Sequence, residues 1–330
     1  TNIAAAAIDG IDKIRLSANW MAAAGHAGED ASLFDTVKTV ANDMCRRLGI
    51  AIPVGKDSLS MRARWQEEGE EYQVVAPVSL IVSAFAPVTD ATRQLTPQLQ
   101  PTNEQSYLLL FDFGAGRNRL GGSCLAQAFS RVGGEAPDID SPAALGNFFA
   151  AIQELSSRGM LLAYHDRSDG GLLATVAEMM FASRLGVSLQ LRGSRENMLA
   201  QLFSEEAGAV VQVTKGKLAQ VQMVLDRHGI AAEAIGRVES TPVLTIRDGG
   251  AAPLRFERKD LQRTWSETSY RIQELRDNPA TAKEEFDRIL DDGDPGLNAH
   301  LTFDANNDIS LQLRGGTKPR VAILREQGVN

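Results

Sequence analysis

The amino-acid sequence predicts an α/β plus α+β protein with two main domains and a polar C-terminal region. Up to about residue 248, short apolar runs typical of strands alternate with segments in which apolar residues recur at helical spacing. A polar stretch with two prolines at 95–105 separates two such units, as expected of a domain linker. After about residue 257 this alternation ends. A length of 330 residues agrees with two or three domains.

The first unit contains one predicted helix and two predicted strand regions. Residues 31–49 repeat apolar side chains at helical spacing and end on Gly49, a common helix stop. Residues 50–61 indicate a strand that runs into a turn and a second extended piece. Residues 76–88 are nearly all apolar, so we expect a strand that is buried on both faces.

The second unit alternates predicted strands with predicted helices. The predicted strands cover 107–114, 160–168, 187–191, 209–213 and 233–246. The predicted helices cover 120–134, 141–159, 169–186 and 215–229. An exposed helix over 258–278, an irregular linker from 291 and a short apolar strand at the end complete the chain.

Composition and charge limit the classes of function. The net charge of -8 disfavours nonspecific binding to nucleic acid, although backbone N–H groups and Mg²⁺ can still hold phosphate locally. No apolar run reaches the roughly 18 residues of a membrane span. Cys45 and Cys124 cannot form a disulfide framework, which favours reduced thiols in the cytoplasm.

The segment YHDRSDGGLLATVAEM at 164–179 is the strongest local signal for ligand binding. A strand ends near Asp166, and two glycines lie in the first turn of the helix that follows. Free N–H groups at such a helix start attract an anion, Asp166 is a suitable Mg²⁺ ligand, and Ser168 can cap the helix or contact phosphate. An ordinary capped turn between a strand and a helix explains the same pattern.

The segment GKDSLSM is a second candidate, because Gly55, Lys56, Asp57 and Ser58 follow an apolar strand. Lys56 can hold a phosphate, and Asp57 can hold Mg²⁺ or orient a substrate hydroxyl. On pattern alone a polar hairpin turn is the slightly favoured interpretation, and the spacing of a Walker A loop is missing.

Two further segments stay ambiguous. The loop 114–123 is glycine-rich, but Arg119 stands where a dinucleotide fingerprint needs its third glycine, so a phosphate nest and a flexible turn are both open. Glu205 and Glu206 precede an apolar strand, where paired acids bind a metal or an amine or, more often, form a solvated turn.

Six ordered segments give the chain a family resemblance. They read TNIAAA, LSANWMAAAGHAGEDASLFD, IPVGKDSLSM, HDRSDGGLL, DPGLN and VAILREQGVN. In this order they resemble the long, single-chain formylglycinamide ribonucleotide amidotransferases, also called phosphoribosylformylglycinamidine synthases. The resemblance implies an internal piece that carries the second half of the synthetase core.

The resemblance also implies the domain organisation. An aminoimidazole ribonucleotide synthetase-like α/β N-terminal domain, truncated at its start, would cover 1–103, and the corresponding α+β C-terminal domain would cover 104–248. A helix and linker would follow over 249–318. Residues 319–330 would be the first strand of a class I glutamine amidotransferase domain, whose catalytic Cys lies further on.

The activity implied by the resemblance is an ATP-dependent ligase reaction of purine synthesis in the cytoplasm. It converts formylglycinamide ribonucleotide and glutamine-derived ammonia to formylglycinamidine ribonucleotide, with Mg²⁺ and ATP or ADP. The chain would contact the first synthetase half and the glutaminase domain; alone it would be inactive and self-associate through bare strands at 50–54 and 76–86. The alternative is a non-catalytic module that holds an auxiliary ADP–Mg²⁺ and scaffolds the ammonia path.

Residue by residue, the resemblance assigns two groups of site residues. Asn2 and Asp166 match Mg²⁺ ligands, with two more acidic ligands expected upstream of Thr1, and Ser168 matches a nucleotide contact. Gly55–Ser58 matches a segment that touches nucleotide, metal and substrate in shorter relatives. Because Lys56 stands where those relatives have a metal-binding Asn, either Asp57 binds the metal or Lys56 binds phosphate directly.

Overall fold

A computed structural model describes residues 1–192, 195–248, 252–297 and 299–307. The chain divides into two units, Thr1–Leu290 and Asp291–Asn330. The described part of the second unit consists of turns in which Asp side chains accept backbone N–H groups, for example Asp291 from Gly293 at 2.8 Å. The strand predicted at 319–330 lies outside the described residues.

The first sheet has three strands in the order β2-β1-β5, with β1 parallel to β2 and antiparallel to β5. These strands are β1 (Arg15–Met21), β2 (Ala51–Ser58) and β5 (Ser79–Phe85). Two short 3₁₀ turns, η1 (Asn2–Ala5) and η2 (Ile11–Lys13), precede them.

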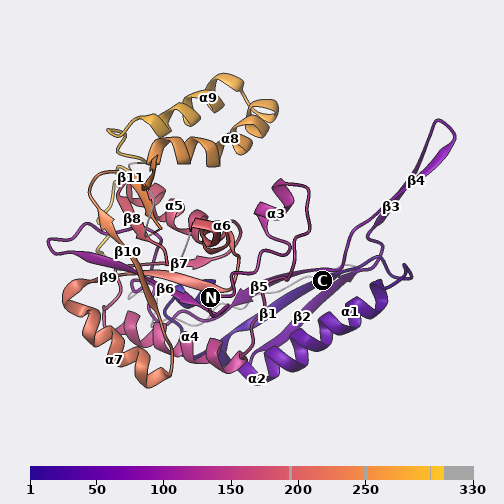
Figure 1. Cartoon of the computed structure of the whole chain (residues 1–330), viewed down its shortest axis with the longest axis horizontal. Coiled ribbons are helices and arrows are strands. Elements are labelled where there is room, and N and C mark those ends of the chain that lie inside the picture. Colours follow the sequence, from indigo (N-terminus) through magenta and orange to yellow (C-terminus); the bar gives the residue numbers. More distant parts are fainter. Residues whose placement is uncertain (193–194, 249–251, 298, 308–330) are drawn as a thin grey trace. The chain divides into compact units, whose positions relative to one another are not determined.

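The connection from β1 to β2 is helical and lies alongside both strands (Figure 1). It consists of α1 (Glu29–Lys38), the π-helical stretch η3 (Thr39–Cys45) and α2 (Arg46–Leu48). Gly49 ends it at φ 70°, where a side chain would be strained. The predicted helix over 31–49 and its glycine stop are therefore confirmed, while the π-helical stretch was not predicted.

A hairpin of β3 (Arg62–Glu67) and β4 (Glu70–Val75) extends away from this sheet (Figure 1). Its two-residue turn places Glu68 at φ 53° and Gly69 at φ 87°, as a tight hairpin turn requires. Trp65 and Tyr72 stack across the two strands with ring centroids 5.6 Å apart. Both strands are largely exposed, and no hairpin was predicted here, because the predicted extended piece ended at residue 61.

The expectation that residues 76–88 are buried on both faces is wrong. Ile81 and Phe85 of β5 are 58% and 61% exposed, and Val54 of β2 is 57% exposed. Both strands lie at edges of the described three-stranded sheet, and the exposure of these side chains shows that no described element covers the face on which they lie. The apolar side chains at 50–54 and 76–86 are therefore partly uncovered, as the family resemblance implied.

The second sheet has seven strands in the order β12-β11-β8-β10-β6-β9-β7. They are β6 (Ser106–Asp112), β7 (Ala163–Arg167), β8 (Gly186–Gln190), β9 (Gly208–Thr214), β10 (Glu233–Glu239), β11 (Val243–Arg247) and β12 (Leu254–Glu257). Only β11 and β8 pair in parallel; the other neighbours are antiparallel.

Helices cover both faces of this sheet. The covering helices are α4 (Pro142–Ser157), α5 (Gly171–Ser183), α6 (Arg195–Phe203) and α7 (Leu218–His228), whereas the short α3 (Cys124–Ala128) and η4 (Lys215–Lys217) lie in connections between elements. One core cluster joins α4 and α7 to alternate residues of β6 such as Leu109 and Phe111. A second cluster joins α5 and α6 to the opposite face, represented by Leu108 and Val210. This alternation is the period of two expected of a strand covered on both sides.

The start of the chain and the predicted linker pack onto this second domain. Ala4 and Ile8 belong to the core cluster that contains α4. The segment 95–105 has no helix or strand, as predicted, but Leu99 is buried. Gln212 of β9 accepts the Gln100 N–H and donates to the Gln100 carbonyl, both at 2.8 Å.

Several predicted boundaries need correction. The helix predicted over 120–134 is only the five-residue α3. Gly121 and Gly133 belong to a loop in which two segments of backbone lie in close contact. Helix α6, strand β12 and helix α9 (Pro279–Asp287) were not predicted; α9 is followed by the short η5 (Arg288–Leu290). The exposed helix at 258–278 is confirmed as α8 (Arg258–Arg276).

Glu154 of α4 forms pH-dependent hydrogen bonds with α7. It accepts hydrogen bonds from His228 at 3.0 Å, Arg227 at 2.5 Å and Arg158 at 3.0 Å. These bonds, that of His228 most strongly, outweigh burial and lower the pKa of Glu154 from 4.5 to about 2.

We expect Glu154→Gln to lower the free energy of unfolding by about 1–2 kcal/mol near neutral pH, after discounting for the exposed arginines. Because the folded-state pKa is depressed, this contribution is complete above pH 4.5 and disappears as the pH falls towards 2. Urea denaturation of both proteins from pH 7 to 3 measures it. A difference between wild type and variant that does not change with pH would contradict this assignment.

Candidate functional site

The turn between β7 and α5 is built around two glycines with positive φ. Gly170 has φ 79° and Gly171 has φ 67°. A Cβ on Gly171 would lie 2.7 Å from the Ser204 carbonyl oxygen, so a side chain does not fit there. Helix α5 begins at Gly171, and the residue before it is Gly170. Ser168 therefore does not cap the helix; it is exposed, and its carbonyl accepts the Gly171 N–H at 3.0 Å.

The structure brings Asn2 and Asp166 together, although they are 164 residues apart in the sequence. The Asn2 side-chain amide donates to Asp166 Oδ1 at 2.9 Å. Two buried or half-buried residues hold the start of the chain in place. The Tyr164 hydroxyl donates to the Thr1 carbonyl at 2.5 Å, and Gln153 donates to the Ala4 carbonyl at 2.9 Å. Asn2 thus reaches the turn through contacts of its own segment with β7 and α4.

A cation of the chain lies next to Asp166. His165 Nδ1 is 3.5 Å from Asp166 Oδ1, and its Nε2 is 2.7 Å from Glu178 Oε2. Burial alone would lower the pKa of His165, but its hydrogen bonds to Asp166 and Glu178 and their charges outweigh burial and raise it to about 9. The His165 hydrogen bond in turn lowers the pKa of Asp166, which is ionised at neutral pH.

The residues at this turn fit part of a Mg²⁺ shell. Mg²⁺ prefers oxygen ligands and usually keeps several waters, and Asp166 and Asn2 supply a carboxylate and an amide oxygen. Rotating the Asn2 amide by half a turn would present its oxygen, because amide orientation follows the hydrogen-bond partners present. In the described ranges, no group of three or more His, Cys, Asp or Glu side chains is placed to hold a metal. These two residues therefore fit as partial ligands.

Gly55–Ser58 form a separate group. All four lie within β2, so the hairpin turn considered on pattern alone is wrong. Lys56 and Asp57 are exposed, and Lys56 Nζ donates to Ser58 Oγ at 3.0 Å. Among the residues that the structure describes, no hydrogen bond or ion pair connects this group with Asn2 or Asp166.

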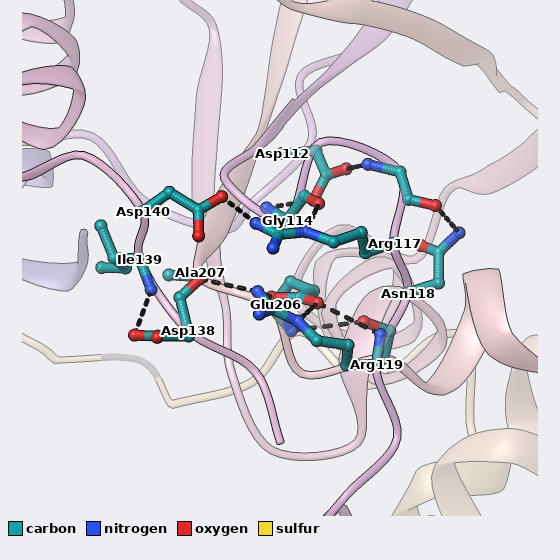
Figure 2. Close-up of polar contacts among 12 residues, drawn as sticks. Asp112, Gly114, Arg117, Asn118, Arg119, Asp138, Ile139, Asp140, Glu206 and Ala207 are labelled. Carbon is teal, nitrogen blue, oxygen red and sulfur yellow. Dashed lines mark hydrogen bonds and ion pairs between the residues drawn. The ribbon is translucent and has the colours of Figure 1, made fainter. Parts of the chain in front are cut away.

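The glycine-rich loop after β6 closes on the chain's own carboxylates (Figure 2). Asp112 accepts the N–H groups of Gly114 at 3.1 Å and Gly116 at 2.7 Å. Arg167, which is 3% exposed, donates to the same carboxylate at 2.5 Å. Asp112 thus occupies the place that an external phosphate would take in a nest, so the loop is neither an open phosphate nest nor an unsupported turn.

Glu206 holds the other side of this loop (Figure 2). Its side chain is fully buried and binds Arg119 through both oxygens, at 2.7 and 2.8 Å. Burial raises the pKa of Glu206, but the hydrogen bonds and charge of Arg119 outweigh it, and the net pKa is lowered. The solvated-turn reading is therefore wrong for Glu206.

Glu205 has a different role, which was not predicted either. Its Oε1 accepts the N–H groups of Cys124 and Gly170, both at 2.8 Å. One side-chain oxygen therefore joins the start of α3 to the turn before α5. The sequence pattern predicts an external anion at this helix start, whereas the structure places the carboxylate of Glu205 there. No local signal distinguishes Glu205 from Glu206.

Two family models match the two domains in the order found here. The model described as FGAR-AT PurM_N-like domain matches residues 1–87, and the model of the AIR synthase related protein C-terminal domain matches residues 113–249. The chain has an AIR synthase-like fold. Its first sheet lies in the AIR synthase-like N-terminal domain, and its second sheet in the C-terminal domain. Both α8 and α9 lie beyond the matched ranges.

Solved structures of the same fold support this assignment. PurLQS from Thermotoga maritima is 13% identical, with a TM-score of 0.51 over 78% of this chain and 38% of that chain. T. maritima PurL complexed with FGAR is also 13% identical, with a TM-score of 0.51 over 78% and 40%. E. coli HypE, a hydrogenase maturation protein, is 18% identical, with a TM-score of 0.52 over 77% of each chain.

The extent of these matches bears on function. The chain spans less than half of the length of the PurL relatives that it matches. At these identities the likeness shows the fold alone, and HypE shares it. None of the helices in the described ranges has the length and apolar character needed to cross a lipid bilayer.

Proposed function

We propose that this chain is part of an ATP-dependent synthetase that converts formylglycinamide ribonucleotide to formylglycinamidine ribonucleotide in purine synthesis. The observation that carries the proposal is the contact between Asn2 and Asp166, formed within two domains that match the FGAR-AT and AIR synthase models. A PurL of the same fold has been solved with FGAR. The HypE likeness shows that the fold by itself does not select this substrate, so the residues must be tested.

At the β7–α5 turn, we propose a Mg²⁺–nucleotide site. Asp166 and Asn2 would each supply one oxygen to Mg²⁺, and the exposed Ser168 would contact the nucleotide. Mg²⁺ would neutralise phosphate charge there. His165 balances the charge of Asp166 from the protein side. Because Glu205 already satisfies the Gly170 N–H, the phosphate would be held through the metal and Ser168 and not by the helix start.

Gly55–Ser58 would serve a different nucleotide or substrate site. The group is exposed and has no polar contact with Asn2 or Asp166 in the described structure. This separation favours two roles in one chain: a β2 segment that contributes to the reacting site, and a β7–α5 turn that holds an auxiliary ADP–Mg²⁺. The ammonia would come from glutamine in a further domain. Cytoplasmic location and contacts with a first synthetase half and a glutaminase belong to the same proposal.

The exposed strands β2 and β5 fit this arrangement. Val54, Ile81 and Phe85 form an apolar surface that another AIR synthase-like domain or a second copy of this chain would cover. Self-association of the chain follows where no such domain is present.

Substitutions in β2 test the catalytic part of the proposal. In the intact protein, we expect Lys56→Ala and Asp57→Asn to lower the rate of formylglycinamidine formation by about 100-fold, because positioned charges dominate phosphoryl transfer. The melting temperature should change little, since both side chains are exposed. Steady-state kinetics with ATP, formylglycinamide ribonucleotide and glutamine measure the rate.

The exposed pair Arg64 and Gln73 of the β3–β4 hairpin provides a control, and Arg64→Ala should leave the rate unchanged. Near-normal turnover in both β2 variants would reject a catalytic role for this segment and would favour the alternative hypothesis of a non-catalytic structural module. Absence of the reaction in the wild-type protein would reject the proposed substrate.

A further inference from the structure

Trp265 of helix α8 contacts α5, the helix that follows the β7–α5 turn. Trp265 Nε1 donates to Glu178 Oε1 at 3.0 Å, and the Trp265 ring lies against Phe181 with centroids 5.9 Å apart. Glu178 and Phe181 belong to α5. Trp265 is 60% exposed, so burial of its ring alone does not explain the direction of its N–H group. This contact joins α5 to a helix that neither family model covers.

The same carboxylate continues towards Asp166. Glu178 uses Oε1 for Trp265 and Oε2 for His165, with His165 Nε2 at 2.7 Å. The other ring nitrogen of His165 lies 3.5 Å from Asp166 Oδ1. Both nitrogens of the imidazole thus face a carboxylate, which restricts rotation of the ring. Asp166 lies one residue before the end of β7, which is at the edge of the described sheet and has a neighbouring strand on one side only.

We propose that Glu178, held by Trp265, is a positioning residue that orients His165 and through it the Asp166 carboxylate. The series Trp265–Glu178–His165–Asp166 couples helix α8 to the turn that holds Mg²⁺–nucleotide. This inference rests on the proposed function of that turn. Hydrogen-bonded partners of a metal ligand commonly change metal affinity about 10–100-fold when they are removed.

Three variants separate positioning from packing. Glu178→Ala removes both hydrogen bonds. Glu178→Gln keeps the shape; its amide oxygen can accept from the Trp265 N–H, and its NH₂ group can donate to Nε2 of a neutral His165. Trp265→Phe keeps the ring against Phe181 but removes the N–H donor. Trp65→Phe is the matched control, because Trp65 stacks on Tyr72 in the β3–β4 hairpin and has no part in the series.

The test is the dissociation constant of ADP with and without Mg²⁺, measured by calorimetry in the intact protein. We expect Glu178→Ala to weaken Mg²⁺–ADP binding about 10-fold, Glu178→Gln to stay within about twofold of wild type, and Trp265→Phe to lie between them. ADP binding without Mg²⁺ should be equal in all variants, because none of them touches the nucleotide. Trp65→Phe should match wild type throughout.

The outcomes that overturn the inference differ from those that overturn the proposed function. Wild-type affinity for Mg²⁺–ADP in Glu178→Ala would reject the positioning role while the nucleotide site stands. A Glu178→Gln variant as weak as Glu178→Ala would show that charge and not positioning matters. Unchanged binding in Trp265→Phe would reject the link to α8, and this variant decides the matter if Glu178→Ala does not fold. No Mg²⁺-dependent ADP binding in wild type would reject the proposed site itself.

Discussion

Replacing Glu206 with alanine is expected to lower the free energy of unfolding by about 3–5 kcal/mol, because it leaves a partner charge buried and unpaired. The Glu206 side chain is fully buried, and the Arg119 side chain that it binds is only 9% exposed. The same carboxylate also accepts the Arg119 backbone N–H at 3.1 Å. Its loss would therefore release both the arginine and the loop after β6. Urea denaturation followed by circular dichroism measures the change.

An exposed acid provides the matched control for this prediction. Glu239 pairs with Arg237 at 2.7 Å, and both side chains are more than one third exposed. Glu239→Ala should cost less than about 1 kcal/mol, because solvent screens an exposed pair. If the free energy of unfolding of Glu206→Ala is within about 1 kcal/mol of the wild-type value, the buried Glu206–Arg119 pair does not stabilise the fold, and the prediction is wrong.

Asp166→Asn is expected to weaken strongly the stabilisation of the intact protein by Mg²⁺–ADP. The substitution removes one negative charge and keeps the shape, so a divalent cation loses its carboxylate ligand. A ligand held at about 100 times its dissociation constant adds roughly 2.7 kcal/mol to apparent stability. We therefore expect a lower melting temperature, weaker retention of nucleotide and a secondary loss of activity. Because the affinity is weakened and not lost, a higher concentration of Mg²⁺–ADP should partly restore the melting temperature and the activity.

Asp169→Asn is the control for this substitution. Asp169 is an exposed acid in the same turn, so its replacement makes the same change in charge close by. It should leave the response to Mg²⁺–ADP unchanged. If Asp166 instead serves the reacting site, turnover would fall at an unchanged melting temperature and ADP would inhibit. Melting temperature and turnover measured on one Asp166→Asn sample distinguish these two results, and an unchanged melting temperature rejects the auxiliary-site reading.

The elements that were predicted well are those with local signals. Helix α4 begins at Pro142 after Ser141, whose hydroxyl accepts the Ala144 N–H at 3.3 Å. A serine cap, a proline in the first turn and a glycine stop each act within one turn of the helix, so they can be recognised from the sequence alone. The strands β6 and β9 were predicted equally well, because a short, nearly continuous apolar run is typical of a strand that is buried on both faces.

The wrong predictions concern residues whose burial or conformation depends on segments that are distant in the sequence but close in space. Apolar residues of β5 were expected to be buried, but a strand's sequence does not say whether a second layer is present. The short α3 was overestimated because Gly121 lies against the backbone of Gly134, a contact between loop segments that periodicity does not show. The resemblance named Asn2 and Asp166 as partners, yet residue patterns alone give no reason for residues 164 positions apart to meet.

By itself, the sequence determined the alternation of strands and helices, the main capping signals and the chemical types of the candidate ligands, because these depend on a residue and its near neighbours. Only the tertiary structure decided what each polar group touches. Glu205 and Glu206 are adjacent and identical, but one carboxylate joins two backbone N–H groups and the other is buried against Arg119. Their roles differ because successive residues point in different directions, and burial and charge partners come from the segments that packing brings to each side.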